Sequence, residues 1–183
     1  MRRIFPIIVV LAALAAAPAV EAASRSMHGV SFTSIDGEPL PMSGFAGQAV
    51  LVVNTASFCG FTRQYGALQQ VFDTYRARGL VVLGVPSNDF GGQEPGTAAE
   101  IKQFCEVNFA VDFPLTEKQV VKGEAAHPFF RAVVAELGEG ASPRWNFHKF
   151  LITPDGRLVG TWPSRVEPDA PELIQAIEAA LPQ

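Results

Sequence analysis

Residues 49–62 read AVLVVNTASFCGFT, an apolar and largely β-branched run that gives way to small and polar residues around one cysteine. The run Ala49–Thr55 is typical of a central strand covered on both faces. From residue 62 to 78 apolar residues recur at spacings of three and four, which predicts an amphipathic helix closed by Gly79. Cys59 is therefore expected at the carboxyl end of a strand and near a helix start, where open α/β sheets carry their chemistry and a thiolate is favoured.

The rest of the pattern predicts an α/β fold with a central mixed sheet and helices on both faces, compatible with a thioredoxin-like fold. A second buried strand, LVVLGVP, follows the first helix, so the two strands should be parallel and joined by a right-handed crossover. We expect further elements in this order: a short hairpin at 30–40 ahead of these strands, then a helix from Thr97 with a capping box to Glu100, a helix at 127–137, strands at 147–153 and 158–162, and a helix at 170–181.

The first residues resemble a secretory signal rather than part of the fold. A short basic start precedes an almost wholly apolar, Ala-rich run, and small residues around 20–24 offer a cleavage site. The alternative is an uncleaved membrane anchor. We predict a signal peptide at 1–22, a single domain at 23–183, a periplasmic or secreted location and no stable membrane association after cleavage.

The charge and the cysteine content limit the partners. The chain has 14 basic and 18 acidic residues and no basic cluster, which argues against nucleic acid as a partner. No Cys/His cluster has the spacing of metal ligands, so no metal is predicted. Two cysteines in an exported protein usually form one structural disulfide, and that alternative stays open for Cys59 and Cys105. Against it, Cys105 lies on a predicted helix that would have to unwind to reach Cys59, which suits a transient bond better.

Three polar side chains fall where they could reach Cys59. Gln93 lies in a Gly-rich loop after the second strand, and Trp145 and Asn146 come just before a later strand. If these elements pair in one sheet, two amides and an indole N–H meet the sulfur at one rim. Such donors favour a thiolate and can hold a departing oxygen. Each residue alone has an ordinary structural reading, as a turn residue or as core.

Three blocks of sequence resemble the signature blocks of the glutathione peroxidase family: VNTASFCGFTRQYGAL, PSNDFGGQEPG and WNFHKFLI, in that order. The resemblance extends from about Met27 to the C-terminus. It implies a thioredoxin-like fold, no cofactor, and reduction of hydrogen peroxide or organic hydroperoxides by a thiol. By the same resemblance Cys59 is the peroxidatic residue, and Gln93, Trp145 and Asn146 complete a catalytic tetrad.

The resemblance also implies how the enzyme is recycled. Cys105 lies in IKQFCEVNFAVDFP, which is similar to the block where thioredoxin-dependent members keep a resolving cysteine. The expected cycle is a Cys59 sulfenic acid, a Cys59–Cys105 disulfide, and reduction by a thioredoxin-like dithiol protein or by glutathione. The short segment between Val120 and Trp145 resembles that of monomeric members, and no arginine group suited to glutathione is evident.

Two other functions remain open at this point. A thioredoxin-fold disulfide oxidoreductase normally needs a C-x-x-C pair, but Thr62 stands where its second cysteine would be. A peroxide sensor would instead pass its oxidation to a partner protein. Two departures from the family pattern carry their own expectations: Asp89 should face solvent, and His148 should lie on the surface, opposite Phe147 in a strand.

Overall fold

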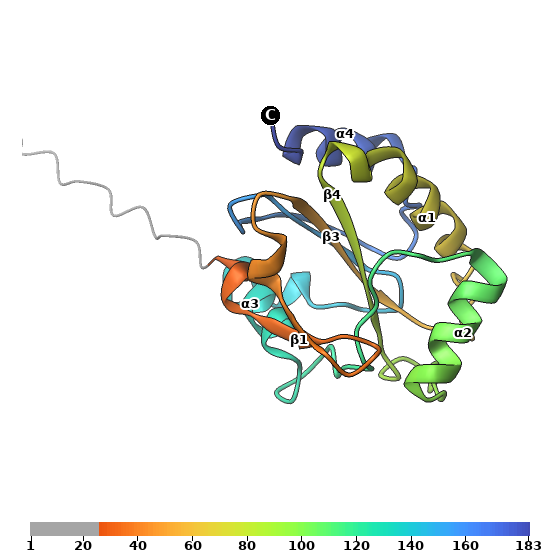
Figure 1. Cartoon of the computed structure of the whole chain (residues 1–183). Coiled ribbons are helices and arrows are strands. Elements are labelled where there is room, and N and C mark those ends of the chain that lie inside the picture. Colours follow the sequence, from red (N-terminus) through yellow and green to blue (C-terminus); the bar gives the residue numbers. More distant parts are fainter. Residues whose placement is uncertain (1–25) are drawn as a thin grey trace, which may run out of the picture.

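The computed structural model describes residues 26–183, so the predicted signal peptide lies outside the described residues. The centre of the fold is a four-stranded mixed sheet with the order β4-β3-β5-β6 (Figure 1). β3 (Ala49–Thr55) pairs in parallel with β4 (Leu80–Pro86) and antiparallel with β5 (Lys149–Ile152). β6 (Leu158–Trp162) closes the sheet antiparallel to β5. The predicted mixed sheet is confirmed.

The helices lie on both faces of this sheet, as the continuous apolar run of β3 requires. Leu51 and Val53 pack into one core with α1 (Gln64–Tyr75) and α4 (Pro171–Ala180). Val50 and Val52 pack into a second core with α3 (Pro128–Leu137). Figure 1 shows α1 and α4 together and α3 on the other side of the strands. The remaining helix, α2 (Ala98–Phe109), lies beside α1.

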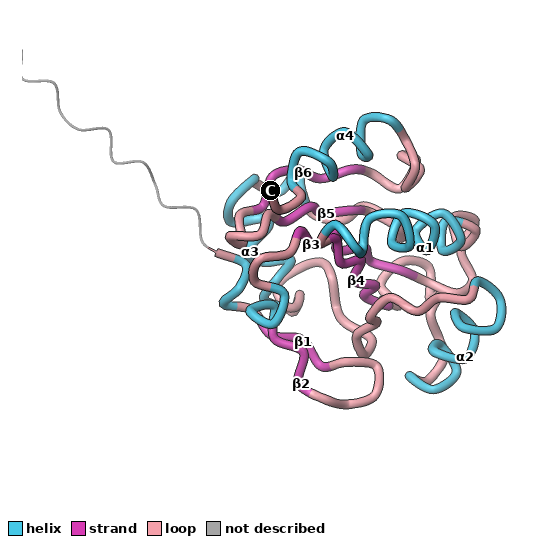
Figure 2. The backbone as a smooth tube through the Cα atoms, turned by 45° about the horizontal axis from the view of Figure 1, so that its top comes forward, coloured by secondary structure: helices cyan, strands magenta, loops and turns pink. Residues whose placement is uncertain are grey.

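The remaining elements are short. β1 (Ser31–Thr33) and β2 (Pro39–Pro41) form the expected hairpin, apart from the main sheet (Figure 2). The 3-10 turns are η1 (Met27–Gly29), η2 (Met42–Phe45), η3 (Arg76–Arg78) and η4 (Glu139–Ala141). None of the helices in residues 26–183 has the length and apolar character needed to cross a membrane.

Local signals in the sequence determine where α1 and α2 begin or end. Gly79 adopts a left-handed φ of 91°, and this turn leads the chain from α1 through η3 into β4. Thr97 caps α2 and forms the predicted capping box with Glu100. These two signals fix the crossover from β3 to β4 and the start of the helix that carries Cys105.

A buried lysine joins β5 to the elements beside it. Lys149 is fully buried, and its Nζ donates to Gln64 Oε1 at 2.6 Å and to the carbonyl oxygens of Ser164 and Val166. Burial lowers the pKa of Lys149 to about 7, and the charge of Glu167 opposes this shift. The lysine therefore fixes the start of β5, directly after the segment that holds Trp145 and Asn146.

The surface position expected for His148 is wrong. The predicted strand at 147–153 begins only at Lys149, and Phe147 has a left-handed φ of 63°, which breaks the in-and-out alternation. Both Phe147 and His148 are buried, and the imidazole stacks on Phe150 with ring centroids 4.8 Å apart. Burial lowers the pKa of His148 to about 4, so the ring is neutral near pH 7.

Candidate active site

Cys59 lies in the turn that joins β3 to α1, as the sequence predicts, and Thr62 fixes the shape of that turn. The Thr62 hydroxyl donates to the Ala56 carbonyl oxygen at 2.9 Å and accepts the Cys59 amide at 2.9 Å. The Thr62 amide also donates to the Cys59 carbonyl oxygen at 3.0 Å. Thr62, which stands where a C-x-x-C motif would have its second cysteine, therefore stabilises the conformation of the loop.

The sulfur of Cys59 is a half-buried free thiol that faces a backbone donor. The Phe61 amide donates to Sγ at 3.4 Å, and within residues 26–183 this is the hydrogen bond that the sulfur receives. Because α1 begins only at Gln64, the cysteine precedes the first helical turn. An amide directed at the sulfur stabilises a thiolate more than a thiol, which suits a nucleophile.

Two of the predicted polar residues contact each other beside this loop. Asn146 Nδ2 donates to Gln93 Oε1 at 2.9 Å, and Asn146 is fully buried. The carbonyl oxygen of Gln93 accepts the amide of Phe58 at 3.0 Å, so the loop of Gln93 is joined to the residue before Cys59. The structure therefore brings Gln93 and Asn146 together at the rim where Cys59 lies.

Trp145 lies at the same rim but is more open to solvent. Its side chain is 39% exposed, and its ring packs against Phe90 with centroids 5.7 Å apart. In the part of the chain that the structure describes, neither its indole nor the amides of Gln93 and Asn146 hydrogen-bond to the sulfur of Cys59. The three side chains thus lie at the rim of Cys59 without holding its sulfur.

Asn54 is a supporting residue that the sequence reasoning missed. Its Nδ2 donates to the Trp145 carbonyl oxygen at 3.1 Å, and its Oδ1 accepts the His148 amide at 3.1 Å. One side chain at the end of β3 therefore holds the segment that carries Trp145 and Asn146. A polar residue inside an otherwise apolar strand was the signal that could have revealed it.

Cys105 is confirmed on α2, and it is a free, fully buried thiol in the core beneath that helix. Burial raises its pKa to about 11, and the charges of Glu94 and Glu106 add to this rise while Tyr65 opposes it. The two cysteines are therefore separate thiols in this conformation. Cys105 has to leave the core before it can react.

The expectation that Asp89 faces solvent is wrong. Its side chain is half-buried, and Oδ2 accepts the Val121 amide at 2.7 Å. The carboxylate therefore joins the Gln93 loop to the segment before α3, because a buried backbone amide needs an acceptor. Ser87 is buried beneath the same loop, and its hydroxyl accepts the Asp89 amide at 3.3 Å.

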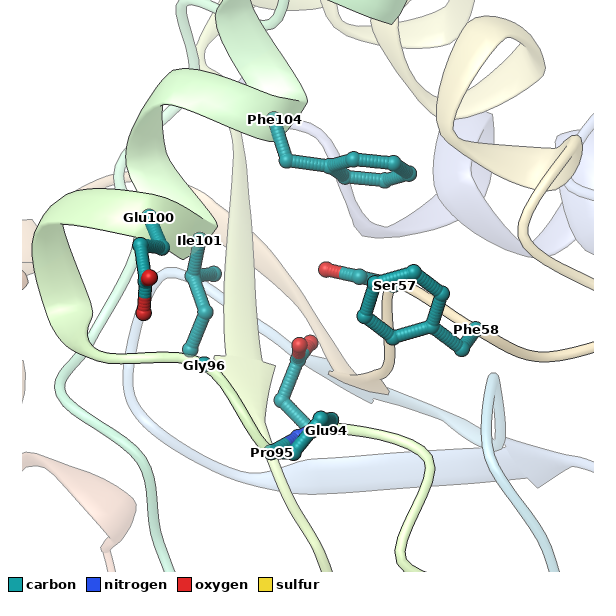
Figure 3. A pocket seen from close by; sticks show the side chains of 8 residues that line it. All are labelled: Ser57, Phe58, Glu94, Pro95, Gly96, Glu100, Ile101 and Phe104. Carbon is teal, nitrogen blue, oxygen red and sulfur yellow. The ribbon is translucent and has the colours of Figure 1, made fainter.

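A cavity of about 400 Å³ separates the Cys59 loop from α2. Glu94 extends into it, and Figure 3 shows the carboxylate between the main-chain turn at Pro95 and the ring of Phe104. The sequence reasoning did not identify this carboxylate. The lining residues are Ser57, Phe58, Glu94, Pro95, Gly96, Glu100, Ile101 and Phe104.

Comparison with known proteins agrees with this geometry. The sequence model of the glutathione peroxidase family matches residues 27–134. The chain belongs to the glutathione peroxidase family. As a member of that family it is an enzyme, an oxidoreductase of the peroxidase type.

Its relatives cover almost the whole described chain. It is 42% identical over 161 residues to a glutathione peroxidase-like peroxiredoxin of Chlamydomonas reinhardtii, covering 86% of this chain and 99% of the relative. It is 42% identical over 167 residues to a hydroperoxy fatty acid reductase of Synechocystis, covering 87% and 98%. These matches extend the family resemblance well beyond the three quoted blocks.

The solved structures confirm the thioredoxin-like fold. The apo crystal structure of Trgpx is 34% identical, with a TM-score of 0.68 and coverage of 85% of this chain and 95% of that one. A thiol:disulfide interchange protein of the thioredoxin family from Chlorobium tepidum is 21% identical with a TM-score of 0.61, over 87% and 99%. The second likeness shows the fold alone.

Proposed function

We propose that this glutathione peroxidase family enzyme reduces hydroperoxides through Cys59 and is resolved by Cys105. The observation that carries the proposal is the half-buried Cys59 sulfur, which receives an amide hydrogen bond beside the Gln93–Asn146 pair. The thiolate attacks one peroxide oxygen, the O–O bond breaks, and the sulfur becomes a sulfenic acid. The remaining oxygen takes a proton and leaves as water or an alcohol.

The polar side chains at the rim have a role in that first step. Charge develops on the leaving oxygen as the O–O bond breaks, and donors already in place there lower the barrier. Asn146 is buried, and its amide is oriented by Gln93, so it needs little rearrangement to act. Gln93, Asn146 and the indole of Trp145 are the donors that we assign to this position.

The rim also favours organic hydroperoxides alongside hydrogen peroxide. Phe58 is 65% exposed next to Cys59, and the partly exposed Trp145 lies on Phe90 at the same rim. These rings offer apolar contact to an alkyl or acyl chain. The Synechocystis relative bears the name of a hydroperoxy fatty acid reductase, which supports the same substrate class.

Asn146→Ala is expected to slow the first step by about 10²-fold, the usual effect of removing one preorganised donor. Gln93 would also lose the partner that orients its amide. Single-turnover kinetics of sulfenic acid formation measure this step alone. Gln70→Ala, on the exposed side of α1, is the matched control. An Asn146→Ala variant that forms sulfenic acid at the wild-type rate would remove Asn146 from the mechanism.

A thioredoxin-like dithiol protein is the reductant that we propose. A two-cysteine cycle ends in an intramolecular disulfide, which a dithiol opens through one mixed disulfide. Arg63, near Cys59, is paired with Glu167 at 2.7 Å, so it is already engaged with a carboxylate. The enzyme would act as a monomer outside the cytoplasm, after removal of residues 1–22.

Steady-state peroxide consumption with each reductant in turn tests the proposal. The expected result is sustained turnover with a thioredoxin-type dithiol protein and slow turnover with glutathione. Full turnover with glutathione alone would contradict the preferred reductant. Negligible turnover with every thiol, together with a mixed disulfide to a client protein in a Cys105→Ser variant, would instead favour a peroxide sensor.

A further inference from the structure

Glu94 is a buried carboxylate that the mechanism above leaves without a role. Its side chain is fully buried, and neither carboxylate oxygen forms a hydrogen bond of ordinary length and angle among residues 26–183, although Ser57 lies close enough to lower the pKa of the carboxyl group. Burying a carboxylate with so few partners costs free energy, so a functional reason for its position has to be considered. The carboxylate extends into a cavity of about 400 Å³ (Figure 3).

The cavity lies between the loop that carries Cys59 and α2, the helix that carries Cys105. Ser57 lines it from the Cys59 loop, and Ile101 and Phe104 line it from α2, the helix of Cys105. The charge of Glu94 acts on Cys105, whose pKa it helps to raise. Glu94 thus faces the space that the Cys105 segment must cross on its way to Cys59.

The main chain of Glu94 is held so that the side chain keeps this position. Its amide donates to Asn88 Oδ1 at 2.8 Å, and its carbonyl oxygen accepts Lys118 Nζ at 3.0 Å. Both bonds come from outside α2. The main chain of Glu94 is therefore held independently of α2.

The resolving step needs a proton to move between the two cysteines. The Cys59 sulfenic acid and the Cys105 thiol condense: an S–S bond forms, the S–O bond breaks, and the thiol proton leaves with the hydroxyl as water. A thiol that is hard to ionise needs a base, and a hydroxyl that leaves needs an acid. One carboxyl group that lies between them can be both in turn.

We propose that Glu94 is the proton-transfer group of the resolving step: it takes the proton of the Cys105 thiol as α2 opens and returns it to the oxygen that leaves Cys59. The disulfide and one water form, and Glu94 ends as the carboxylate it was at the start. This inference rests on the proposed function of Cys59 and Cys105. It gives a chemical role to a residue that lies within the second sequence block but outside the tetrad.

Burial raises the pKa of Glu94 above its ordinary value, and Ser57 and Lys118 oppose the rise. The closed position of α2 is therefore favoured while Glu94 is protonated, and this contribution is lost as pH rises through the raised pKa. A higher pH therefore has two effects: it ionises Glu94, which can then act as a base, and it makes opening of α2 less costly. The ionisable groups that face the carboxylate are Lys118 before α3, Tyr65 on α1, and Glu100 and Cys105 on α2.

The test separates the two chemical steps. Each protein receives one equivalent of hydroperoxide. Sulfenic acid formation is measured with a dimedone-type probe in variants that also carry Cys105→Ser. Disulfide formation is measured in proteins that keep Cys105, by intact mass spectrometry of samples quenched at successive times. Glu94→Gln is expected to slow disulfide formation by about 10²-fold and to remove the rise of its rate with pH on the acid side. Glu172→Gln, the same change at an exposed carboxylate on α4, is the control.

The other outcomes are also decisive. Glu94→Asp keeps a carboxyl group and should restore the pH dependence in part, which a purely structural role would not do. Disulfide formation in Glu94→Gln at the wild-type rate, or at a lower rate with the wild-type pH profile, would overturn the inference. Absence of sulfenic acid in a Cys105→Ser protein with intact Glu94 would contradict the proposed function instead, so the two failures are distinct.

Discussion

Replacement of Cys59 by serine is expected to lower peroxide consumption by at least about 10³-fold, because a serine hydroxyl is not ionised near neutral pH and is a weak nucleophile. A serine hydroxyl is smaller than the half-buried sulfur and fits in its place without a steric clash, so the fold should persist. The Thr62 contacts that shape the loop use main-chain atoms of Cys59 and remain available. Consumption of one equivalent and of excess peroxide are both measured.

The comparison with Cys105 makes this result specific. A Cys105→Ser variant keeps the nucleophile and should still consume a first equivalent of peroxide. If Cys59→Ser consumed peroxide at the wild-type rate while folded, Cys59 would not be the peroxidatic residue. Loss of consumption in both variants, with both folded, would indicate that the two thiols act together already in the first step.

The second large effect is expected at Cys105. Its replacement should lower turnover with a dithiol protein by about 10²-fold or more, since the sulfenic acid then lacks its resolving thiol and proceeds to sulfinic acid. Cys105 is fully buried, so serine leaves a hydroxyl in an apolar core at a cost of about 1–3 kcal/mol. Cys105→Ala avoids this polar group and serves as the second variant.

The readouts for Cys105 are steady-state turnover and the oxidation state of Cys59. Both variants should lose turnover alike and accumulate over-oxidised Cys59 under repeated peroxide. The urea concentration at the unfolding midpoint shows whether each variant is folded under the assay conditions. Turnover that persists in folded Cys105→Ala would mean that an external thiol resolves Cys59 directly, as in a one-cysteine peroxidase.

The strands at the centre were predictable because their signals are local. Ala49–Thr55 and Leu80–Pro86 are continuous apolar runs, and both have the predicted bounds. The capping box from Thr97 to Glu100 is likewise a short-range pattern, and it is confirmed. The α/β order then allows few sheet arrangements.

The misplaced residues were those whose surroundings come from distant parts of the chain. His148 is buried because Phe147 adopts a left-handed φ, which strand alternation cannot anticipate. Asp89 is held by the Val121 amide, which lies 32 residues further along the chain. In both cases a residue that reads as exposed in the sequence is buried or half-buried because of a contact with a distant part of the chain.

Glu94 was missed for a similar reason. A glutamate between Gln93 and Pro95 in a Gly-rich loop reads as solvent-exposed, because such loops usually run over the surface. Lys118 and Asn88 hold its main chain, while the neighbouring Cys59 loop and α2 enclose its side chain. A buried carboxylate of this kind becomes visible only once these three segments are placed together.

The central claim is that Cys59 and Cys105 form a bond in each turnover, and mass spectrometry after one equivalent of hydroperoxide tests it most directly. We predict that the reduced protein loses two hydrogen atoms and that digestion yields one peptide pair linked through Cys59 and Cys105. Reduction by a dithiol protein should restore the starting mass. A protein that gains oxygen on Cys59 while Cys105 stays open to alkylation would contradict the account.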